Sequence, residues 1–332
     1  MRVLVTGGAG FIGSHLIRKL REQKHDVDAI DNHSTCPAVS KRREKEIEKD
    51  KAVEVWGMDI KTTYAVLDSF EKRDRGKGII KEDQPAVNAI VHLAAPISIE
   101  ESVRDPGKYA DEIYKGTISV IDAAKAKGVK RVILASTAAV YGNPDKMPIN
   151  EYIKTEPLSP YAISKLAAEN YAHMAAKNDG LETVILRFFN VYGPDQDPTS
   201  AYSGVISNFM AQAKNRQPFV IFGDGNQTRD FVYVCDVCDA IIAALLGKAE
   251  PGIVMNIGSA SETPILELSQ KIAKIAGVPH KIDKKEARKG DILHSVAAIE
   301  RAKKHLGYEP KVSLEEGLKK TWEWFNAHYK QG

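Results

Sequence analysis

The stretch Arg2-Val3-Leu4-Val5-Thr6-Gly7-Gly8-Ala9-Gly10-Phe11-Ile12-Gly13-Ser14 decides the fold. Residues 2–6 form an apolar run of strand length, and the glycines after it open a helix. Glycine lets the backbone pass close to a pyrophosphate, whose charge is met by free N–H groups and the positive end of the helix dipole. Gly7, Gly10 and Gly13 fall at i, i+3 and i+6, which differs from the spacing of the commoner dinucleotide sites. A glycine turn alone is also compatible with simple punctuation between strand and helix.

Six more apolar runs of strand length recur between helical patterns. Runs that are this apolar and β-branched are typical of strands buried on both faces of a parallel sheet. The sequence therefore predicts an α/β fold, a doubly wound parallel-sheet Rossmann domain with a smaller mixed α/β domain. The runs are Val27–Asp31, Val53–Asp59, Ala89–Ala95, Arg131–Thr137, Thr183–Phe189 and Ile253–Ile257.

The rhythm of strand and helix changes beyond Phe188, where a loop rich in Pro, Gly, Asp and Ser is followed by shorter elements. We place the Rossmann domain at residues 1–186, with a return segment near 230–258, and a second domain at 187–332. Ser313 and Glu316 have the spacing of a capping box. The predicted helices of this part are Ile265–Gly277, Ala298–Leu306 and Leu314–His328.

Composition excludes several classes of protein. The 332 residues carry 47 Lys+Arg against 44 Asp+Glu, and charges of both signs alternate over 40–51, which predicts a solvated helix and no nucleic-acid partner. No apolar run approaches the ~20 residues of a membrane helix, so we expect no membrane partner and a cytoplasmic location. Cys36, Cys235 and Cys238 form neither a disulfide framework nor a complete zinc site, so no metal is expected.

The second predicted strand ends at Asp31, eighteen positions after Gly13. A carboxylate there accepts hydrogen bonds from an adenosine ribose and repels a 2′-phosphate, which favours NAD over NADP. Two alternatives stay open. Asp31 and Asn32 could simply begin a turn, and the basic residues 41–43 could fold back onto the ribose and reverse the preference.

Tyr161-Ala162-Ile163-Ser164-Lys165 begins a predicted helix after Pro160, which places Tyr161 and Lys165 one turn apart on one face. The ammonium is expected to lower the phenol pKa, ordinarily ~10, by favouring the phenolate. The pair would then serve as a proton shuttle. Taken alone, such spacing also occurs in surface pairs.

Standing together in this order, these motifs resemble the extended short-chain dehydrogenase/reductase family, and within it nucleotide-sugar epimerases of the UDP-glucose 4-epimerase type. The resemblance covers nearly the whole chain. Besides the glycine turn and Tyr161–Lys165, the stretches that carry it are His92–Ala95, Ser136–Gly142, Arg187–Pro194, Gly223–Val232 and Arg288–Asp291.

The resemblance implies roles for particular residues. Tyr161 would be the base, Thr137 would hydrogen-bond the sugar hydroxyl, and Lys165 would also hold the nicotinamide ribose. Cofactor contacts are expected from Gly7, Gly10, Phe11, Ile12, Gly13, Asp31, Asn32, Asp59, Ile60, Leu93, Ala94 and Ala95, and substrate contacts from Ser136, Asn190, Arg229, Arg288 and Ser295.

The activity that the resemblance implies is NAD-dependent epimerisation of UDP-glucose and UDP-galactose at C4 through a 4-keto sugar. A small Ser295 suggests that the N-acetylated pair is accepted too. Ala138 and Ala139 stand where related dehydratases carry acid and base, which disfavours dehydration. A UDP-glucuronate decarboxylase, a reductase, a C2 or C5 epimerase and a non-catalytic NAD-binding regulator remain as alternatives.

Two departures from the family pattern and one expected partner complete the predictions. Ile113 stands where many relatives have Asn, which would alter proton relay, and Ala298 stands where relatives place a helix-capping Asp. We expect a homodimer formed by the helices at 106–127 and 160–178. In the second of these, Leu166, Tyr171 and Met174 lie near the small residues Ala167, Ala168, Ala172 and Ala175, which would let a partner helix approach closely.

Overall fold

The computed structural model describes residues 1–35, 37–81, 84–196, 204–287 and 292–329, so the predictions made for Cys36 and Arg288 lie outside the described residues. Its centre is a seven-stranded parallel sheet of order β10-β6-β5-β4-β1-β2-β3. The prediction of a doubly wound parallel sheet is confirmed. The strands are β1 (Arg2–Thr6), β2 (Asp26–Ile30), β3 (Val53–Trp56), β4 (Ala89–His92), β5 (Arg131–Thr137), β6 (Glu182–Phe188) and β10 (Ile253–Ile257).

Three predicted strands are shorter than expected at their carboxyl ends. Asp31, Asp59 and Ala95 lie just beyond β2, β3 and β4. In a doubly wound fold, ligands bind outside the carboxyl ends of the strands, at the point where the strand order reverses. Here the order reverses between β1 and β4, so the residues that the strands leave out are those best placed to meet a ligand.

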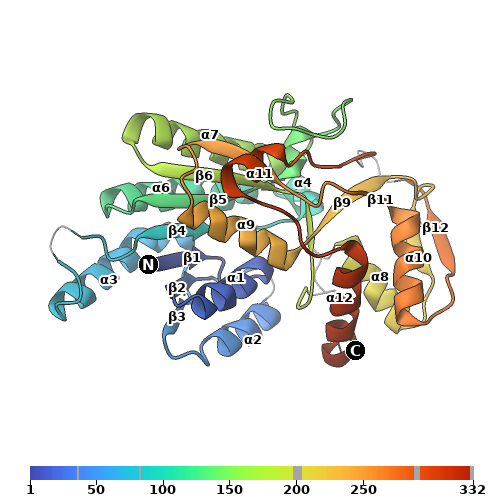
Figure 1. The fold of residues 1–332 in the computed structure, drawn as a ribbon, viewed down its shortest axis with the longest axis horizontal. Helices are drawn as coiled ribbons and strands as arrows, with labels where there is room; N and C mark the ends of the chain where they lie inside the picture. Colours follow the sequence, from blue (N-terminus) through green and yellow to red (C-terminus); the bar gives the residue numbers. More distant parts are fainter. Residues whose placement is uncertain (36, 82–83, 197–203, 288–291, 330–332) are drawn as a thin grey trace.

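Helices cover both faces of the sheet (Figure 1). They are α1 (Phe11–Glu22), α2 (Pro37–Ile47), α9 (Val234–Leu246) and α11 (Glu300–Leu306) on one face, and α3 (Thr63–Gly76), α6 (Gly116–Ala126) and α7 (Pro160–Asp179) on the other. Val3 and Val5 of β1 belong to the first apolar core and Leu4 to the second, as the alternation of side chains along a strand requires. The sheet is therefore buried on both sides.

The second domain has its own apolar core. It contains two small sheets, β11-β9-β7 and β12-β8. Its strands are β7 (Asn190–Tyr192), β8 (Phe219–Phe222), β9 (Thr228–Tyr233), β11 (Glu262–Pro264) and β12 (Ile282–Lys285), and its helices are α8 (Val205–Lys214), α10 (Ile265–Ala276) and α12 (Leu314–His328). Ser313 caps α12, because its hydroxyl accepts a hydrogen bond from the Glu316 N–H at 3.3 Å.

The chain passes between the two domains more than once. After β9 it returns to the first domain through α9, which packs on α1, and β10, which pairs with β6. Helix α11, which we assigned to the second domain, packs against α9 and β10. It begins at Glu300, two residues later than predicted, and Ile299 rather than Ala298 takes the N-cap position, without a side-chain cap. The domain boundary near residue 187 stays a prediction.

The alanines of α7 have a different role from the one expected. Ala168, Ala172 and Ala175 are fully buried in the core between α7 and the sheet of their own chain. The expectation that they let a partner helix approach is therefore wrong, because the apolar face of α7 that they form is covered by β-strands. Ile163 and Met174, on the same helix, are exposed.

Three shorter elements between β4 and α6 complete the sheet's second face: α4 (Ile99–Arg104), α5 (Pro106–Tyr109) and a π-helix over Ala110–Lys115. Ile113 lies in this π-helix and is buried. Within the described ranges, no helix is long and apolar enough to cross a bilayer. Nor do the described His, Cys, Asp and Glu side chains form a cluster of three that could hold a metal ion.

Candidate active site

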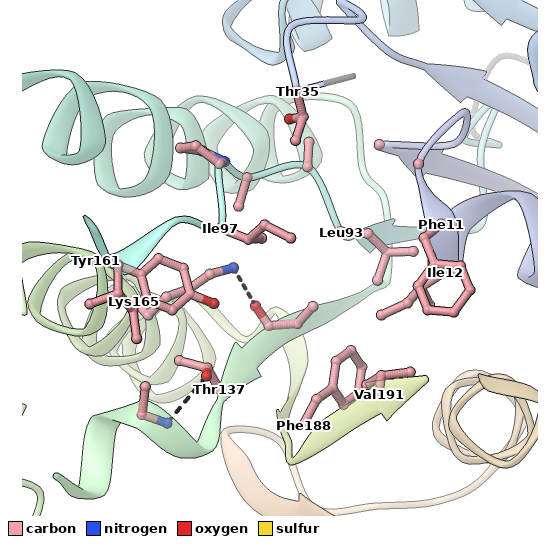
Figure 2. A pocket seen from close by; sticks show the side chains of 18 of the residues that line it. Phe11, Ile12, Thr35, Leu93, Ile97, Thr137, Tyr161, Lys165, Phe188 and Val191 are labelled. Atoms are coloured by element: carbon pink, nitrogen blue, oxygen red, sulfur yellow. Dashed lines mark hydrogen bonds between the residues drawn. The ribbon is translucent and has the colours of Figure 1, made fainter. Parts of the chain in front are cut away.

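A cavity of about 1130 Å³ opens where the carboxyl ends of the central strands meet the second domain. All predicted site residues except Arg288, which lies outside the described part of the chain, line it. Figure 2 shows Tyr161, Lys165 and Thr137 at one end of this cavity and Phe11 and Ile12 at the other. The lining includes Gly7, Gly10, Gly13, Asp31, Asn32, Asp59, Ile60, Leu93, Ala94, Ala95, Ser136, Asn190, Arg229 and Ser295.

The glycine turn is packed too tightly for any side chain. Gly7 adopts a positive φ of +71°, and a Cβ on it would lie 2.8 Å from the Ala94 nitrogen. A Cβ on Gly13 would lie 2.2 Å from the Gly7 carbonyl oxygen. Helix α1 starts directly after this turn, and the first N–H groups of a helix have no partner within it. The turn thus forms a cradle that suits the pyrophosphate of a dinucleotide.

The carboxylates that follow β2 and β3 are held in place by backbone groups. Asp31 accepts hydrogen bonds from the Ala9 N–H at 3.0 Å and the His33 N–H at 2.8 Å. Asp59 accepts one from the Lys61 N–H at 2.9 Å and begins a short 3₁₀ helix. Asp31 therefore does begin a turn, and it also lines the cavity. The two readings of this residue are compatible.

Tyr161, Lys165 and Thr137 lie together at the other end of the cavity. The Tyr161 and Thr137 side chains line the same end of the cavity, and the Thr137 hydroxyl accepts from the Ala139 N–H at 3.2 Å. The Lys165 ammonium donates to the Ala135 carbonyl oxygen at 2.9 Å. Helix α7 positions both residues because Ser159 caps its N-terminus by accepting from the Ala162 N–H at 3.2 Å. The predicted constellation is thus assembled.

The expected lowering of the Tyr161 pKa by Lys165 is not found, because the effect of burial is larger. Burial raises the pKa of Tyr161 to about 12, against which the hydrogen bond from Thr137 acts. Burial also lowers the pKa of Lys165 to about 8, while the charge of Glu169 acts in the opposite direction. The ammonium points at a backbone carbonyl, so it does not favour the phenolate directly. Deprotonation of Tyr161 must therefore depend on what fills the cavity.

The predicted substrate-binding residues differ in how they are held. Ser136 lines the cavity, but its hydroxyl donates to the Glu169 carboxylate. Arg229 donates to the carbonyl oxygens of Thr228 at 2.8 Å and Ile292 at 2.6 Å. Asn190 is exposed and Ser295 is buried at the cavity wall. Their contacts with substrate stay predictions.

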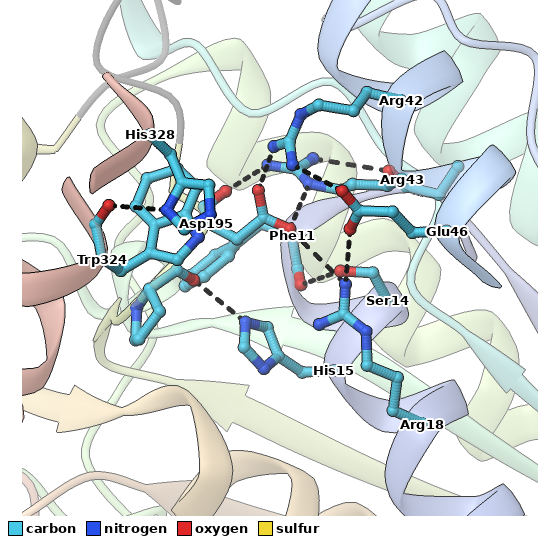
Figure 3. Close-up of polar contacts among 12 residues, drawn as sticks. Phe11, Ser14, His15, Arg18, Arg42, Arg43, Glu46, Asp195, Trp324 and His328 are labelled. Carbon is cyan, nitrogen blue, oxygen red and sulfur yellow. Dashed lines mark hydrogen bonds and ion pairs between the residues drawn. The ribbon is translucent and has the colours of Figure 1, made fainter. Parts of the chain in front are cut away.

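Sequence reasoning considered Arg43 only as one of the basic residues that could reach the ribose, and it missed the burial of this side chain on α2. Its guanidinium donates to the carbonyl oxygens of Ala9, at 3.4 Å, and Asp195, and its Nε lies 3.2 Å from an Asp195 carboxylate oxygen (Figure 3). The expected helix over 40–51 is present but ends at Ile47, and it is solvated on one side only, because Arg43 is buried. The alternative in which residues 41–43 reverse the preference for NAD over NADP requires one of them to reach the cavity. Arg43 does line the cavity, but its guanidinium is paired with the Asp195 carboxylate. Local sequence gave no signal, because Asp195 is distant in the chain.

A second missed feature is a buried chain of hydrogen bonds through His92. Thr117 donates to the Ile113 carbonyl oxygen at 2.7 Å, so its oxygen accepts from His92 Nε2 at 3.1 Å. His92 Nδ1 must then accept from the Thr6 hydroxyl at 2.7 Å. The network assigns a neutral imidazole with its proton on Nε2. It joins the end of β1, next to the glycine turn, to the π-helix.

This arrangement predicts an acid-sensitive fold. Burial lowers the pKa of His92 to about 3, with a smaller effect of the Lys165 charge. The unfolded chain binds a proton at this residue near pH 6.5 and the folded chain does not, so stability falls as the pH drops from 6.5 toward 3. From pH 7 to pH 5 the loss is about 2 kcal/mol.

Urea unfolding at both pH values, compared between the wild type and His92→Gln, measures this contribution. The variant should lose less stability on acidification than the wild type does. Equal losses in the two proteins would contradict the assignment of a neutral, buried His92.

Comparison with known proteins places the chain in a family. The model of the NAD dependent epimerase/dehydratase family matches residues 3–258. A putative UDP-glucose 4-epimerase of Methanocaldococcus jannaschii is 37% identical, and the match covers 97% of each chain. The crystal structure of UDP-glucose 4-epimerase from Thermotoga maritima with UDP-glucose superposes with a TM-score of 0.87 at 35% identity, covering 98% of this chain and 99% of that one.

Two other similar solved structures are of enzymes named for different sugars. UDP-glucuronic acid 4-epimerase from Bacillus cereus, a mutant with NAD and a substrate analogue, has a TM-score of 0.88, 31% identity and coverage of 99% and 100%. UDP-N-acetylglucosamine 4-epimerase from Methanobrevibacter ruminantium has 0.86, 31% and 99% of each chain. The chain belongs to the NAD dependent epimerase/dehydratase family. Within it, the chain is an extended short-chain dehydrogenase/reductase of the nucleotide-sugar epimerase type.

Proposed function

We propose that this protein interconverts UDP-glucose and UDP-galactose by NAD-dependent epimerisation at C4, and that it also accepts the N-acetylated pair. The observation that carries the proposal is that Tyr161, Thr137 and Lys165 share one cavity with the glycine cradle. Relatives named for UDP-glucose epimerisation along the full chain support the same substrate.

Different residues of the cavity would bind the cofactor, transfer the proton and bind the diphosphate. When bound, NAD supplies a reversible hydride acceptor, and the cradle of α1 with Asp31 would hold it. Thr137 and Tyr161 would receive the C4 hydroxyl, whose proton the Tyr161 oxygen takes as the sugar becomes a ketone and later returns. Asn190 and Arg229 would bind the nucleotide diphosphate while the sugar turns over, because a guanidinium keeps its charge at every pH of interest. Asp31 would disfavour NADP by repelling its 2′-phosphate.

Other reactions find less support in the cavity. Ala138 and Ala139 line it beside Thr137 with methyl groups, which cannot act as acid or base in a dehydration.

Incubation of the NAD-loaded protein with UDP-galactose tests the proposal. UDP-glucose should form while the absorbance of reduced nicotinamide stays constant over many turnovers. Stoichiometric reduction of NAD would indicate a net oxidoreductase, and bound cofactor without conversion would indicate a regulator.

Ser295 is expected to set which sugars enter. It is buried at the cavity wall, and its small side chain leaves room for an acetamido group. Ser295→Tyr should lower kcat/KM for UDP-N-acetylglucosamine at least tenfold, by filling that room, and affect UDP-glucose much less. Ser295→Ala, which keeps the space, is the matched control. Equal losses on both sugars in Ser295→Tyr would show that Ser295 does not select the substrate.

A homodimer remains part of the proposal. Exposed apolar side chains on α7, namely Ile163 and Met174, support it. Light scattering on the purified protein should give twice the mass of the 36.5 kDa chain. A single-chain mass at micromolar concentration would exclude the dimer.

A further inference from the structure

Three side chains that lie one turn apart along α7 face three consecutive residues at the end of β5. The pairs are Tyr161 with Thr137, Lys165 with the Ala135 carbonyl oxygen, and Glu169 with the Ser136 hydroxyl. The first two pairs belong to the candidate active site. The third has no role in the proposed reaction, although it fixes the residue between the other two contacts.

Glu169 carries a charge in the protein interior. Only 3% of its surface is exposed, and it forms a two-pronged ion pair with Arg187 of β6, of which 5% is exposed. Arg187 Nε lies 2.9 Å from one carboxylate oxygen and Nη2 lies 2.6 Å from the other. Arg187 stands directly opposite Ser136 in the register of β5 and β6. The carboxylate therefore bridges α7 and both strands.

Stability alone gives a poor reason for such a pair. Replacing a buried ion pair by apolar side chains is often neutral or stabilising, because desolvation opposes the attraction. The position of the pair gives a better one. Glu169 follows Lys165 by one turn, and Lys165 is buried with a neutral carbonyl oxygen as its hydrogen-bond partner.

The electrostatic surroundings of Lys165 make Glu169 important. Burial lowers the pKa of Lys165 to about 8, and the charge of Glu169 opposes this shift. The other titratable groups packed nearby are Tyr161 on α7, the neutral His92 at the end of β4, Tyr109 on α5, whose ring meets that of Tyr161, and Arg187 with Tyr141 behind Glu169. Among these groups, Glu169 supplies the negative charge.

We propose that Glu169, held by Arg187, is a positioning residue that keeps the positive charge on Lys165 and aligns the end of β5 with α7. The proposal rests on the proposed function, because it assigns Lys165 to the proton shuttle with Tyr161. It predicts two separable effects, one on charge and one on alignment.

Glu169→Gln tests the charge. Its amide oxygen still accepts from Ser136, but the negative charge is gone and Arg187 is left unbalanced near Lys165. The pKa of Lys165 should fall, so the alkaline limb of the kcat profile of the NAD-loaded enzyme should move to lower pH by roughly one unit. Arg187→Met removes the opposite charge and should move the limb to higher pH. The Arg187→Met variant also carries the test if Glu169→Gln does not fold.

Ser136→Ala tests the alignment. It removes the contact between Glu169 and β5 but leaves the ion pair, so kcat should fall without a shift of the alkaline limb. A limb that stays in place in both charge variants would overturn the proposal, since a merely structural pair changes activity without changing the titration of Lys165.

An NMR titration of the Lys165 side chain, assigned with Lys165→Met, separates this proposal from the proposed function. The titration should move to lower pH in Glu169→Gln even if the wild type proves inactive on UDP-sugars. In that case the proposed function fails and the positioning role stands. If the wild type is active on UDP-sugars but the Lys165 titration does not move in Glu169→Gln, the positioning role fails and the proposed function stands.

Discussion

Tyr161→Phe is expected to lower kcat for UDP-galactose by about a thousandfold while the protein keeps its fold and its cofactor. The phenol oxygen is the group that takes and returns the proton of the C4 hydroxyl in the proposed reaction, and phenylalanine cannot replace it. The ring is buried and packs edge-on against the Tyr109 ring, so it stays in place when the hydroxyl is removed. The interconversion of UDP-galactose and UDP-glucose measures the loss.

Tyr152→Phe is the matched control. Tyr152 is 82% exposed, and its ring, which the substitution keeps, packs against the Arg301 guanidinium. This variant should turn over at the wild-type rate. If Tyr161→Phe instead retained activity within tenfold of the wild type, the proton would have to leave through another group, and the proposed mechanism would be wrong.

Gly13→Ala is expected to abolish tight NAD binding. The new Cβ would lie 2.2 Å from the Gly7 carbonyl oxygen and 2.8 Å from the Gly8 Cα, and both of these are backbone atoms. The turn must therefore move, and the N–H groups at the start of α1 move with it. A hydrogen bond to a charged group contributes about 1.5–3 kcal/mol, so the loss of two weakens binding about a hundredfold or more. Calorimetric titration with NAD measures the affinity.

Gly76→Ala controls for the general effect of adding a methyl group. A Cβ at Gly76, the last residue of α3, meets no atom within 4 Å, so NAD affinity should be unchanged. Urea unfolding of Gly13→Ala separates the two consequences of its clash: overpacking costs about 1–3 kcal/mol, which leaves a folded protein to titrate. A folded Gly13→Ala that binds NAD as the wild type does would refute the cradle.

The pKa of Tyr161 links the predictions for Tyr161→Phe and Gly13→Ala. In the protein without ligands, burial raises the pKa of Tyr161 to about 12. A phenol with this pKa is protonated at neutral pH, and a bound NAD would add a positively charged nicotinamide that favours the phenolate. Loss of the cradle in Gly13→Ala should therefore impair proton transfer as well as cofactor binding.

The sequence by itself determined the central sheet and pointed to the side chains that line the cavity. Each strand of the sheet is a short apolar run, and burial on both faces requires this pattern locally. The glycine turn and the pair Tyr161 and Lys165 are also local, since neighbours three or four positions apart decide both motifs. The cavity is lined by all the site residues that we named from the sequence, apart from Arg288, which lies outside the described residues.

Only the tertiary structure decided which residues hold the buried polar side chains in and around the cavity. Arg43 reaches Asp195, Glu169 joins Ser136 to Arg187, and His92 connects Thr6 with Thr117, in each case across different elements of the fold. The burial of Ala168 and the raised pKa of Tyr161 have the same origin. Periodicity along a chain reports which face of an element is apolar, but the partner of a buried polar group depends on which elements pack together. That choice is made by contacts between residues distant in sequence.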